Sequence, residues 1–381
     1  MDFGTLAVIC AVALLGPVLS LPRWLHLPVV IGELVVGVVL GATGLQVLHA
    51  ENATFAFLAE IGFALVMFVA GSHVPIRDRA LRADFTVGAG RAVAIGVLAV
   101  GVGVLVARVF GTGHSALYAV LLASSSAGLV LPIIAGNGLS GPAVVALLPQ
   151  IAMADAACIV ALPLAVDPPH ALRALLGSVV VLAAAGVVFL ALRHLEASGR
   201  RRAVHHLSEE RGLAIELRLS LTLLFGLAAL AVLTHVSVML AGFSLGLAVA
   251  GVGEPRRLTK QLFALTEGFF APVFFVWLGA SLNLRDLVTH PSSIALGLVL
   301  GVGAVLVHGL LSLSHQPVAL AVMSAGQLGV PVAAATLGAQ LGLLGPGEPA
   351  ALLLGALVTI AAVAVASGRA VATPAPQPSS G

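Results

Sequence analysis

Long blocks of hydrophobic residues follow one another along this chain, separated by short stretches that are polar or rich in glycine and proline. A block of about 20 apolar residues has the length of a helix that crosses a bilayer. The pattern predicts thirteen such segments, at residues 4–20, 28–48, 55–73, 85–107, 114–136, 142–166, 171–193, 216–234, 237–252, 261–282, 291–313, 317–343 and 349–367. The sequence therefore predicts an all-α, polytopic membrane protein with about 13 transmembrane helices in a lipid bilayer.

The composition supports this class and excludes several others. Of the 381 residues, 60% are hydrophobic and 9% are charged, whereas soluble domains are about 25% charged. Both cysteines, Cys10 and Cys158, lie inside apolar segments, which argues against a disulfide framework or a cysteine metal site. The chain has no nucleotide-binding loop, nucleophile elbow or metal-ligand spacing. We expect no enzyme, no cofactor, no resident metal and no nucleic-acid partner.

The basic residues predict the orientation of the chain. With thirteen segments, fourteen of the eighteen lysines and arginines fall on one side of the membrane and three on the other, while Arg91 lies within a segment. Basic residues collect on the cytoplasmic side. The bias therefore places the N-terminus outside and the C-terminus in the cytoplasm.

One long polar linker, at 194–215, suggests how the chain is organised. It leaves a first six-segment repeat at about 1–166, a bridging helix at 171–193 and a second repeat at about 216–367. Joining two six-helix units through one extra helix inverts the second unit relative to the first. The remaining residues, 368–381, end in a run rich in proline and serine that is expected to be disordered.

Two segments at matching positions of these repeats carry interruptions. A pair of interrupted segments in the two halves of a transporter is the best sequence indication of its binding site. The interrupting residues are Ser124, Ser125, Ser126, Gly128 and Pro132 in the first repeat, and Gly326, Gln327 and Pro331 in the second.

Asp155 is the candidate ion-binding residue. It stands alone in the apolar segment that follows the first interrupted one. A carboxylate at mid-membrane costs about 3 kcal/mol or more, so it is retained for a function. Because burial penalises the bare charge, this side chain can bind either a proton or a cation, and the two compete. The hydroxyls of Ser125 and Ser126 could add ligands for a monovalent cation. The alternative is an Asp that only pairs within the helix bundle.

His308 and Glu267 are further ionisable residues within apolar segments. His308 could pair with Asp155 and change its charge near neutral pH, or it could be a neutral, hydrogen-bonded histidine. Glu267 is expected either to support the site or to hydrogen-bond another helix.

Three stretches resemble a known family: LPVVIGELVVGVVLGATGL at 27–45, LAEIGFALVMFVAGSHV at 58–74 and LTEGFFAPVFFVWLGASLNL at 265–284. Together with the serine run after residue 123, they resemble the monovalent cation:proton antiporters, in particular the bacterial branch of potassium-efflux systems and sodium/proton antiporters. The resemblance covers residues 1–367 and is most specific at 265–284.

This resemblance implies a thirteen-helix fold with inverted repeats and two broken helices that cross. It also implies a homodimer in the cell membrane, and a secondary antiporter that exchanges H⁺ for Na⁺ or K⁺ by alternating access, with the family's essential carboxylate at Asp155. One deep carboxylate suggests electroneutral exchange.

The chain departs from the family pattern at several positions. Ala154 stands where the family has a polar residue, and His308 falls where a basic residue is usual. The second broken helix opens with Ala325-Gly326-Gln327-Leu328, where the family often has an Arg/Gln-Gly-Glu type motif. The alternatives that these departures leave open are a channel or uniporter, a different selectivity, and a sensor that does not transport.

Overall fold

All regular structure in the described residues is helical, which confirms the predicted fold class. The computed structural model describes residues 3–20, 29–74, 77, 85–199, 210–211, 213–253, 256–282, 285 and 289–372. The chain forms two compact units, and each unit is discontinuous in sequence. Each unit takes helices from both predicted repeats, and the inverted relation of those repeats stays a prediction.

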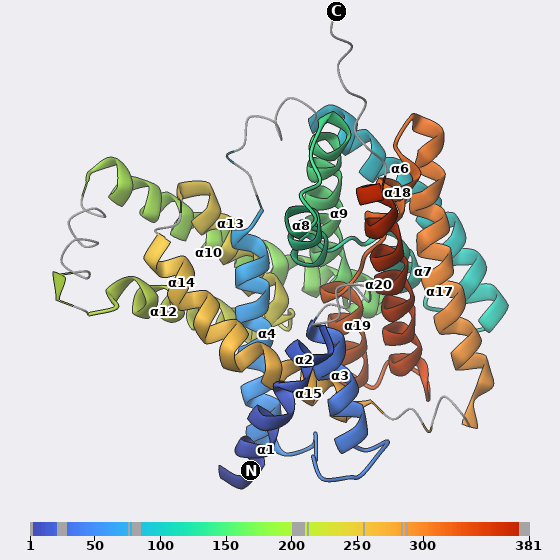
Figure 1. Cartoon of the computed structure of the whole chain (residues 1–381), viewed down its shortest axis with the longest axis horizontal. Helices are drawn as coiled ribbons and strands as arrows, with labels where there is room; N and C mark the ends of the chain where they lie inside the picture. Colours follow the sequence, from blue (N-terminus) through green and yellow to red (C-terminus); the bar gives the residue numbers. More distant parts are fainter. Residues whose placement is uncertain are drawn as a thin grey trace, which may run out of the picture. The chain divides into compact units, whose positions relative to one another are not determined.

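The first unit combines residues 1–23, 27–77 and 167–286. Its helices, labelled in Figure 1, are α1 (Phe3–Ala13), α2 (Leu15–Ser20), α3 (Val29–Leu40), α4 (Ala53–Ser72), η1 (Pro168–His170), α10 (Ala171–Ala197), α12 (Ile215–Leu233), α13 (Val238–Val252), α14 (Arg256–Leu265), the π-helix η2 (Thr266–Phe270) and α15 (Ala271–Ser281). Asn52 begins α4, because its side-chain oxygen accepts hydrogen bonds from the backbone N–H groups of Thr54 and Phe55.

Glycines let the helices of this unit approach each other closely. A methyl group added to Gly37 of α3 would collide with the Val276 carbonyl of α15, and one added to Gly279 would collide with the Leu34 carbonyl. Gly62 of α4 meets the Phe270 carbonyl in the same way. These backbone contacts need glycine, because any side chain would force the helices apart.

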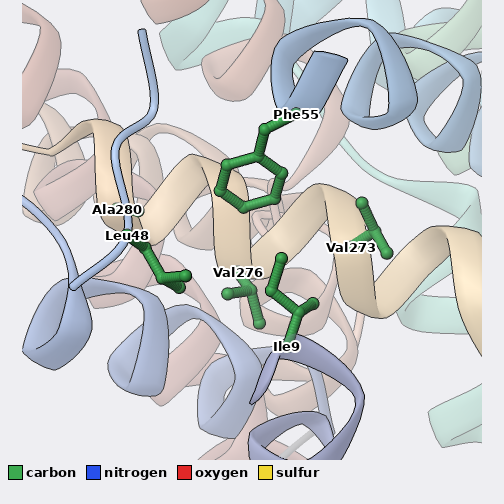
Figure 2. Packing of buried hydrophobic residues seen from close by; sticks show 6 residues of the cluster. All are labelled: Ile9, Leu48, Phe55, Val273, Val276 and Ala280. Atoms are coloured by element: carbon green, nitrogen blue, oxygen red, sulfur yellow. The ribbon is translucent and has the colours of Figure 1, made fainter. Parts of the chain in front are cut away.

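Apolar side chains from distant parts of the sequence fill the space around α15. Figure 2 shows Phe55 of α4 and Ile9 of α1 directed toward each other, beside Val273 and Val276 of α15. Leu48, from the turn before α4, completes this cluster with Ala280. The most family-specific stretch, 265–284, therefore supplies one wall of the core of the first unit.

The second unit combines residues 24–26, 78–166 and 287–381. Its helices are α6 (Phe85–Phe110), α7 (Ser115–Ala123), α8 (Ala127–Gly136), α9 (Pro142–Val166), α17 (Pro291–Gly309), η3 (Leu310–Ser314), α18 (Val318–Met323), α19 (Gly329–Gln340) and α20 (Glu348–Ala372). Helix α17 packs along α20, and α6 packs along α7 (Figure 1). Pro291 opens α17, where its missing N–H would have no partner in any case.

The two interrupted segments are broken helices, although the prolines do not make the breaks. The first break is confined to Ser124–Ser126, and α8 runs through both Gly128 and Pro132. The second break lies between Met323 and Gly329, and Pro331 sits in the first turn of α19. Pro331 removes no helical hydrogen bond there, because N–H groups in a first turn have no partner within the helix. Pro132 is the sixth residue of α8, past the first turn, and the helix continues through it. The expectation that these prolines interrupt the helices is therefore wrong.

The described helices follow the predicted apolar segments closely. Eight of them are long and apolar enough to cross a membrane, and four shorter apolar helices accompany them in the described residues. The count of thirteen crossings stays a prediction. Helix α20 continues to Ala372, into the segment expected to be disordered. Half of the polar linker, at 200–209 and 212, and the last residues, 373–381, lie outside the described residues.

Candidate functional site

Asp155 lies at the centre of α9 and meets the start of the second half of a broken helix. Its side chain is buried, and its Oδ2 accepts a hydrogen bond of 2.8 Å from the backbone N–H of Ala127, the first residue of α8. The N-terminal end of a helix carries a partial positive charge, which stabilises a nearby anion. The other carboxylate oxygen, Oδ1, accepts no hydrogen bond within the described residues. One oxygen is therefore held by the protein and one is available.

The three serines of the first break have different roles. Ser124 ends α7, because it adopts an extended backbone and its hydroxyl donates to the Leu121 carbonyl. The backbone carbonyl of Ser126 accepts the first hydrogen bond of α8, from Val130. Ser125 has a buried hydroxyl without a partner among the described residues. A buried polar group without a partner calls for an explanation such as a bound ion or water.

The second break closes against the end of α7 through Gln327. The Gln327 side chain donates from Nε2 to the Leu121 carbonyl, at 2.7 Å, and its backbone N–H donates to the Thr359 hydroxyl of α20. Gly326 packs tightly against Val130 and Val363. The two breaks therefore touch, and an uncharged amide satisfies a carbonyl at the C-terminal end of α7.

One interpretation of the sequence is that His308 pairs with Asp155. The structure shows no such pair. His308 is fully buried on α17, and its Nδ1 lies 2.9 Å from the Ser324 hydroxyl at the second break. The backbone carbonyl of Leu122, at the first break, interacts with the same ring. His308 thus contacts both breaks and forms no ion pair in the described part of the chain.

Two glutamines that sequence reasoning missed extend this buried network. Gln150 of α9 donates from Nε2 to the Ser324 hydroxyl, and its Oε1 accepts from Nε2 of Gln316, each at 3.0 Å. Both side chains are buried. An amide five residues before Asp155 in an otherwise apolar segment was the available signal, but nothing in the sequence indicated its partners.

A second missed group surrounds Glu348. Its Oε1 is 2.6 Å from both the Tyr118 hydroxyl and Nδ1 of His114, and its Oε2 accepts from the Gly345 N–H at 2.9 Å. Glu348 is buried in the first turn of α20. This cluster fastens the start of α7 to the start of α20. Tyr118 is the chain's only tyrosine, which could have served as a signal.

Glu267 is not part of this arrangement of second-unit residues. It lies on the π-helix of the first unit, where it is exposed and acts electrostatically on the buried Glu33. Its expected role in supporting Asp155 stays a prediction.

Comparison with known proteins identifies the family of the chain. A family model described as "Sodium/hydrogen exchanger, transmembrane" matches residues 10–372. The chain belongs to this sodium/hydrogen exchanger family. This membership confirms the resemblance drawn from the three sequence stretches.

Two curated relatives of this exchanger-family chain are named as Na⁺/H⁺ antiporters. It is 23% identical to the putative Na⁺/H⁺ antiporter YjbQ of Bacillus subtilis over 378 residues, which cover 93% of the chain and 61% of YjbQ. It is 24% identical to the probable Na⁺/H⁺ antiporter 3 of Methanocaldococcus jannaschii over 349 residues, which cover 86% of each protein. The chain therefore spans about three fifths of the length of YjbQ.

The fold of this exchanger-family chain is also similar to a solved structure. The sodium proton antiporter MjNhaP1 from Methanocaldococcus jannaschii, determined at pH 8, matches with a TM-score of 0.67 and 18% sequence identity, over 97% of both chains. At this identity the match shows the shared fold.

Proposed function

We propose that the chain is a secondary antiporter that exchanges Na⁺ for H⁺ at Asp155. One observation carries the proposal: a buried carboxylate in mid-helix is held through one oxygen by the first amide of α8, and its other oxygen is available. A carboxylate in such a position costs about 3 kcal/mol or more in a bilayer and is retained for a function. The family match and the Na⁺/H⁺ antiporter names of the relatives support sodium as the cation.

The proposed cycle uses competition at a single group. When Asp155 holds a proton it is neutral, and its hydrogen bond from Ala127 suffices to orient it. When the proton leaves, the carboxylate binds Na⁺ through Oδ1, and the hydroxyl of Ser125 in the first break, which has no partner among the described residues, adds a ligand. Hydroxyl and carboxylate oxygens suit a hard monovalent cation. Alternating access then carries each ion across in turn.

Exchange of one proton for one sodium follows from this site. Among the described side chains that contact the two breaks, Asp155 is the one carboxylate. The other contacts to the end of α7 come from the Gln327 amide and the His308 imidazole, and neither has a carboxylate partner. Each half-cycle therefore carries one positive charge, and the exchange is electroneutral. The same proposal places the chain in the cell membrane as a homodimer, with the N-terminus outside and the C-terminus cytoplasmic, from the distribution of lysine and arginine and the family resemblance.

Proteoliposomes with a pH-sensitive dye inside test the proposal. Na⁺, K⁺ or Li⁺ is added to vesicles with an acidic interior, for the wild type, Asp155→Asn and Asp167→Asn. Asp167 is the matched control, because it is a partly exposed carboxylate that lies outside the two breaks and pairs with His170. We expect Na⁺ to collapse the gradient in the wild type and in Asp167→Asn, and to have no effect in Asp155→Asn.

The other outcomes separate the alternatives. Cation flux without proton movement would indicate a channel or uniporter, and a response to K⁺ alone would change the assigned cation. A response in Asp155→Asn equal to the wild type would refute the site. Repeating the assay with the membrane potential clamped by valinomycin and K⁺ tests the stoichiometry, because electroneutral exchange does not respond to the clamp.

A further inference from the structure

We propose that His308 is an uncharged positioning residue, protonated on Nε2, which joins the two helix breaks by accepting from Ser324 and donating to the Leu122 carbonyl. This inference deepens the proposed function where it concerns transport, and its spectroscopic part is independent of it. It differs from what the resemblance implies, because a basic side chain is usual at this position.

The argument begins with the direction of the hydrogen bonds. The amide of Gln316 donates to Gln150, and the amide of Gln150 donates to the Ser324 hydroxyl. Ser324 therefore accepts one hydrogen bond and has a single proton left to donate. Two acceptors lie within reach of that proton: Nδ1 of His308, at 2.9 Å, and the Ala321 carbonyl, at 2.7 Å. The choice between them fixes the state of the histidine.

In the first arrangement, the Ser324 proton goes to the histidine. Nδ1 of His308 is then an acceptor, and a neutral ring carries its proton on Nε2. Because Nδ1 is taken by Ser324, we assign the interaction of the ring with the Leu122 carbonyl to Nε2. Nε2 has no partner of strict hydrogen-bond geometry among the described residues, so the proposed chain of hydrogen bonds requires the ring to turn toward that carbonyl.

In the second arrangement, Ser324 donates to Ala321 and His308 must donate from Nδ1. If the ring is neutral, its bare Nε2 then faces the Leu122 carbonyl, and two buried acceptors oppose each other, which is unfavourable. If the ring is charged, both contacts are satisfied, but a buried cation remains without a carboxylate partner. The first arrangement avoids both penalties, so the geometry favours the neutral ring.

No charged neighbour changes this conclusion. The ionisable residues on the described helices packed against α17, together with the N-cap of α7, are Arg91, Arg108, His114, Tyr118, Glu348 and Arg369. The structure pairs none of them with His308, and Asp155 bonds to Ala127 instead. A positive charge on His308 would therefore have no counter-ion in the described part of this unit.

The functional consequence concerns the C-terminal end of α7. Its last carbonyls, Leu121 and Leu122, face donors from Gln327 and His308, both uncharged in this scheme. The partial negative charge of that helix end is thus satisfied by hydrogen bonds rather than by a fixed cation. Asp155 then meets the incoming cation without a competing positive charge nearby.

The direct test is nitrogen NMR of the full chain in lipid bilayers, with ¹⁵N-labelled histidine. The chain has twelve histidines, and the His308 signal is the one that disappears in His308→Gln but persists in His194→Gln, an exposed control on α10. We expect the neutral, Nε2-protonated signature from about pH 6 to about pH 9. An imidazolium signature at neutral pH, or protonation on Nδ1, would overturn the assignment whether or not the protein transports sodium.

A transport measurement tests the positioning role. His308→Gln keeps a neutral donor and is expected to leave the apparent KM for Na⁺ within about threefold of the wild type. His308→Lys adds a fixed charge and is expected to raise that KM about tenfold or more, since the charge competes with Na⁺ near Asp155. Gel filtration verifies that both variants remain folded. Wild-type kinetics in His308→Lys together with an inactive, folded His308→Gln would show that a charge is required and would refute the proposal.

Discussion

Replacing Glu348 by glutamine is expected to destabilise the second unit by about 2–4 kcal/mol. Glu348 accepts three hydrogen bonds, two on Oε1 from Tyr118 and His114 and one on Oε2 from Gly345. A glutamine amide has one nitrogen that only donates, so at least one of these donors would face another donor. A hydrogen bond to a charged group contributes about 1.5–3 kcal/mol, and an unsatisfied buried group adds to the loss.

An exposed pair of the same chemistry provides the comparison. Asp167 and His170 lie 2.9 Å apart, with side chains 23% and 68% exposed, whereas the Glu348 and His114 side chains are 6% and 25% exposed. Solvent weakens an exposed pair, so Asp167→Asn is expected to cost about 0.5 kcal/mol or less.

Equilibrium unfolding provides the measurement. Each purified variant is titrated with sodium dodecyl sulfate in mixed micelles and followed by circular dichroism. A double-mutant cycle with Tyr118→Phe then isolates the coupling between Tyr118 and Glu348, which are 2.6 Å apart. An equal loss in Glu348→Gln and Asp167→Asn, or strict additivity in the cycle, would show that burial of this cluster does not set its strength.

Three further changes test other parts of the structure. Gly279→Ala should lower the free energy of unfolding by about 1–3 kcal/mol in the same titration, because its methyl group would meet the Leu34 carbonyl. Gly226→Ala, with open space around it, should cost nothing. Equal effects of the two changes would contradict the close approach of α3 and α15. Asn52→Ala removes the cap of α4 and should cost about 1 kcal/mol, and an unchanged midpoint would argue against the cap. Gln327→Leu removes the 2.7 Å bond to the end of α7 and should lower the exchange rate about tenfold, unless the contact between the breaks is irrelevant to transport.

Much of the fold can be predicted from the sequence, because length and hydrophobicity identify membrane helices. The predicted segment 142–166 coincides with α9, and 55–73 falls within two residues of α4. Asp155 also stood out, since a lone carboxylate in an apolar helix has a large cost. Ser125 was found because serines interrupt an apolar run, and its hydroxyl is indeed buried without a partner among the described residues.

The rest was hidden because it depends on contacts between distant parts of the chain. Ser324 joins Gln150 and His308 across 174 and 16 residues, and no local pattern indicates such partners. Pro132 and Pro331 misled the placement of the breaks. Pro331 lies in a first turn, where proline removes no bond of the helix, and α8 continues through Pro132. The serine run ends α7 through its own hydrogen bonds, and serine is a weaker sequence signal for a helix end than proline.

The close approach of helices through glycine has a consequence for how this family is recognised. Gly37, Gly62 and Gly279 belong to the stretches that reveal the family, and each of them faces a backbone carbonyl of another helix. These three glycines mark close contacts between helix backbones in the first unit, whereas Asp155 lies in the second unit. A descendant of this chain that lost Asp155 would keep the whole signature, so homology searches would still report an exchanger. For this fold, ancestry and activity are encoded at different positions and can be inherited separately.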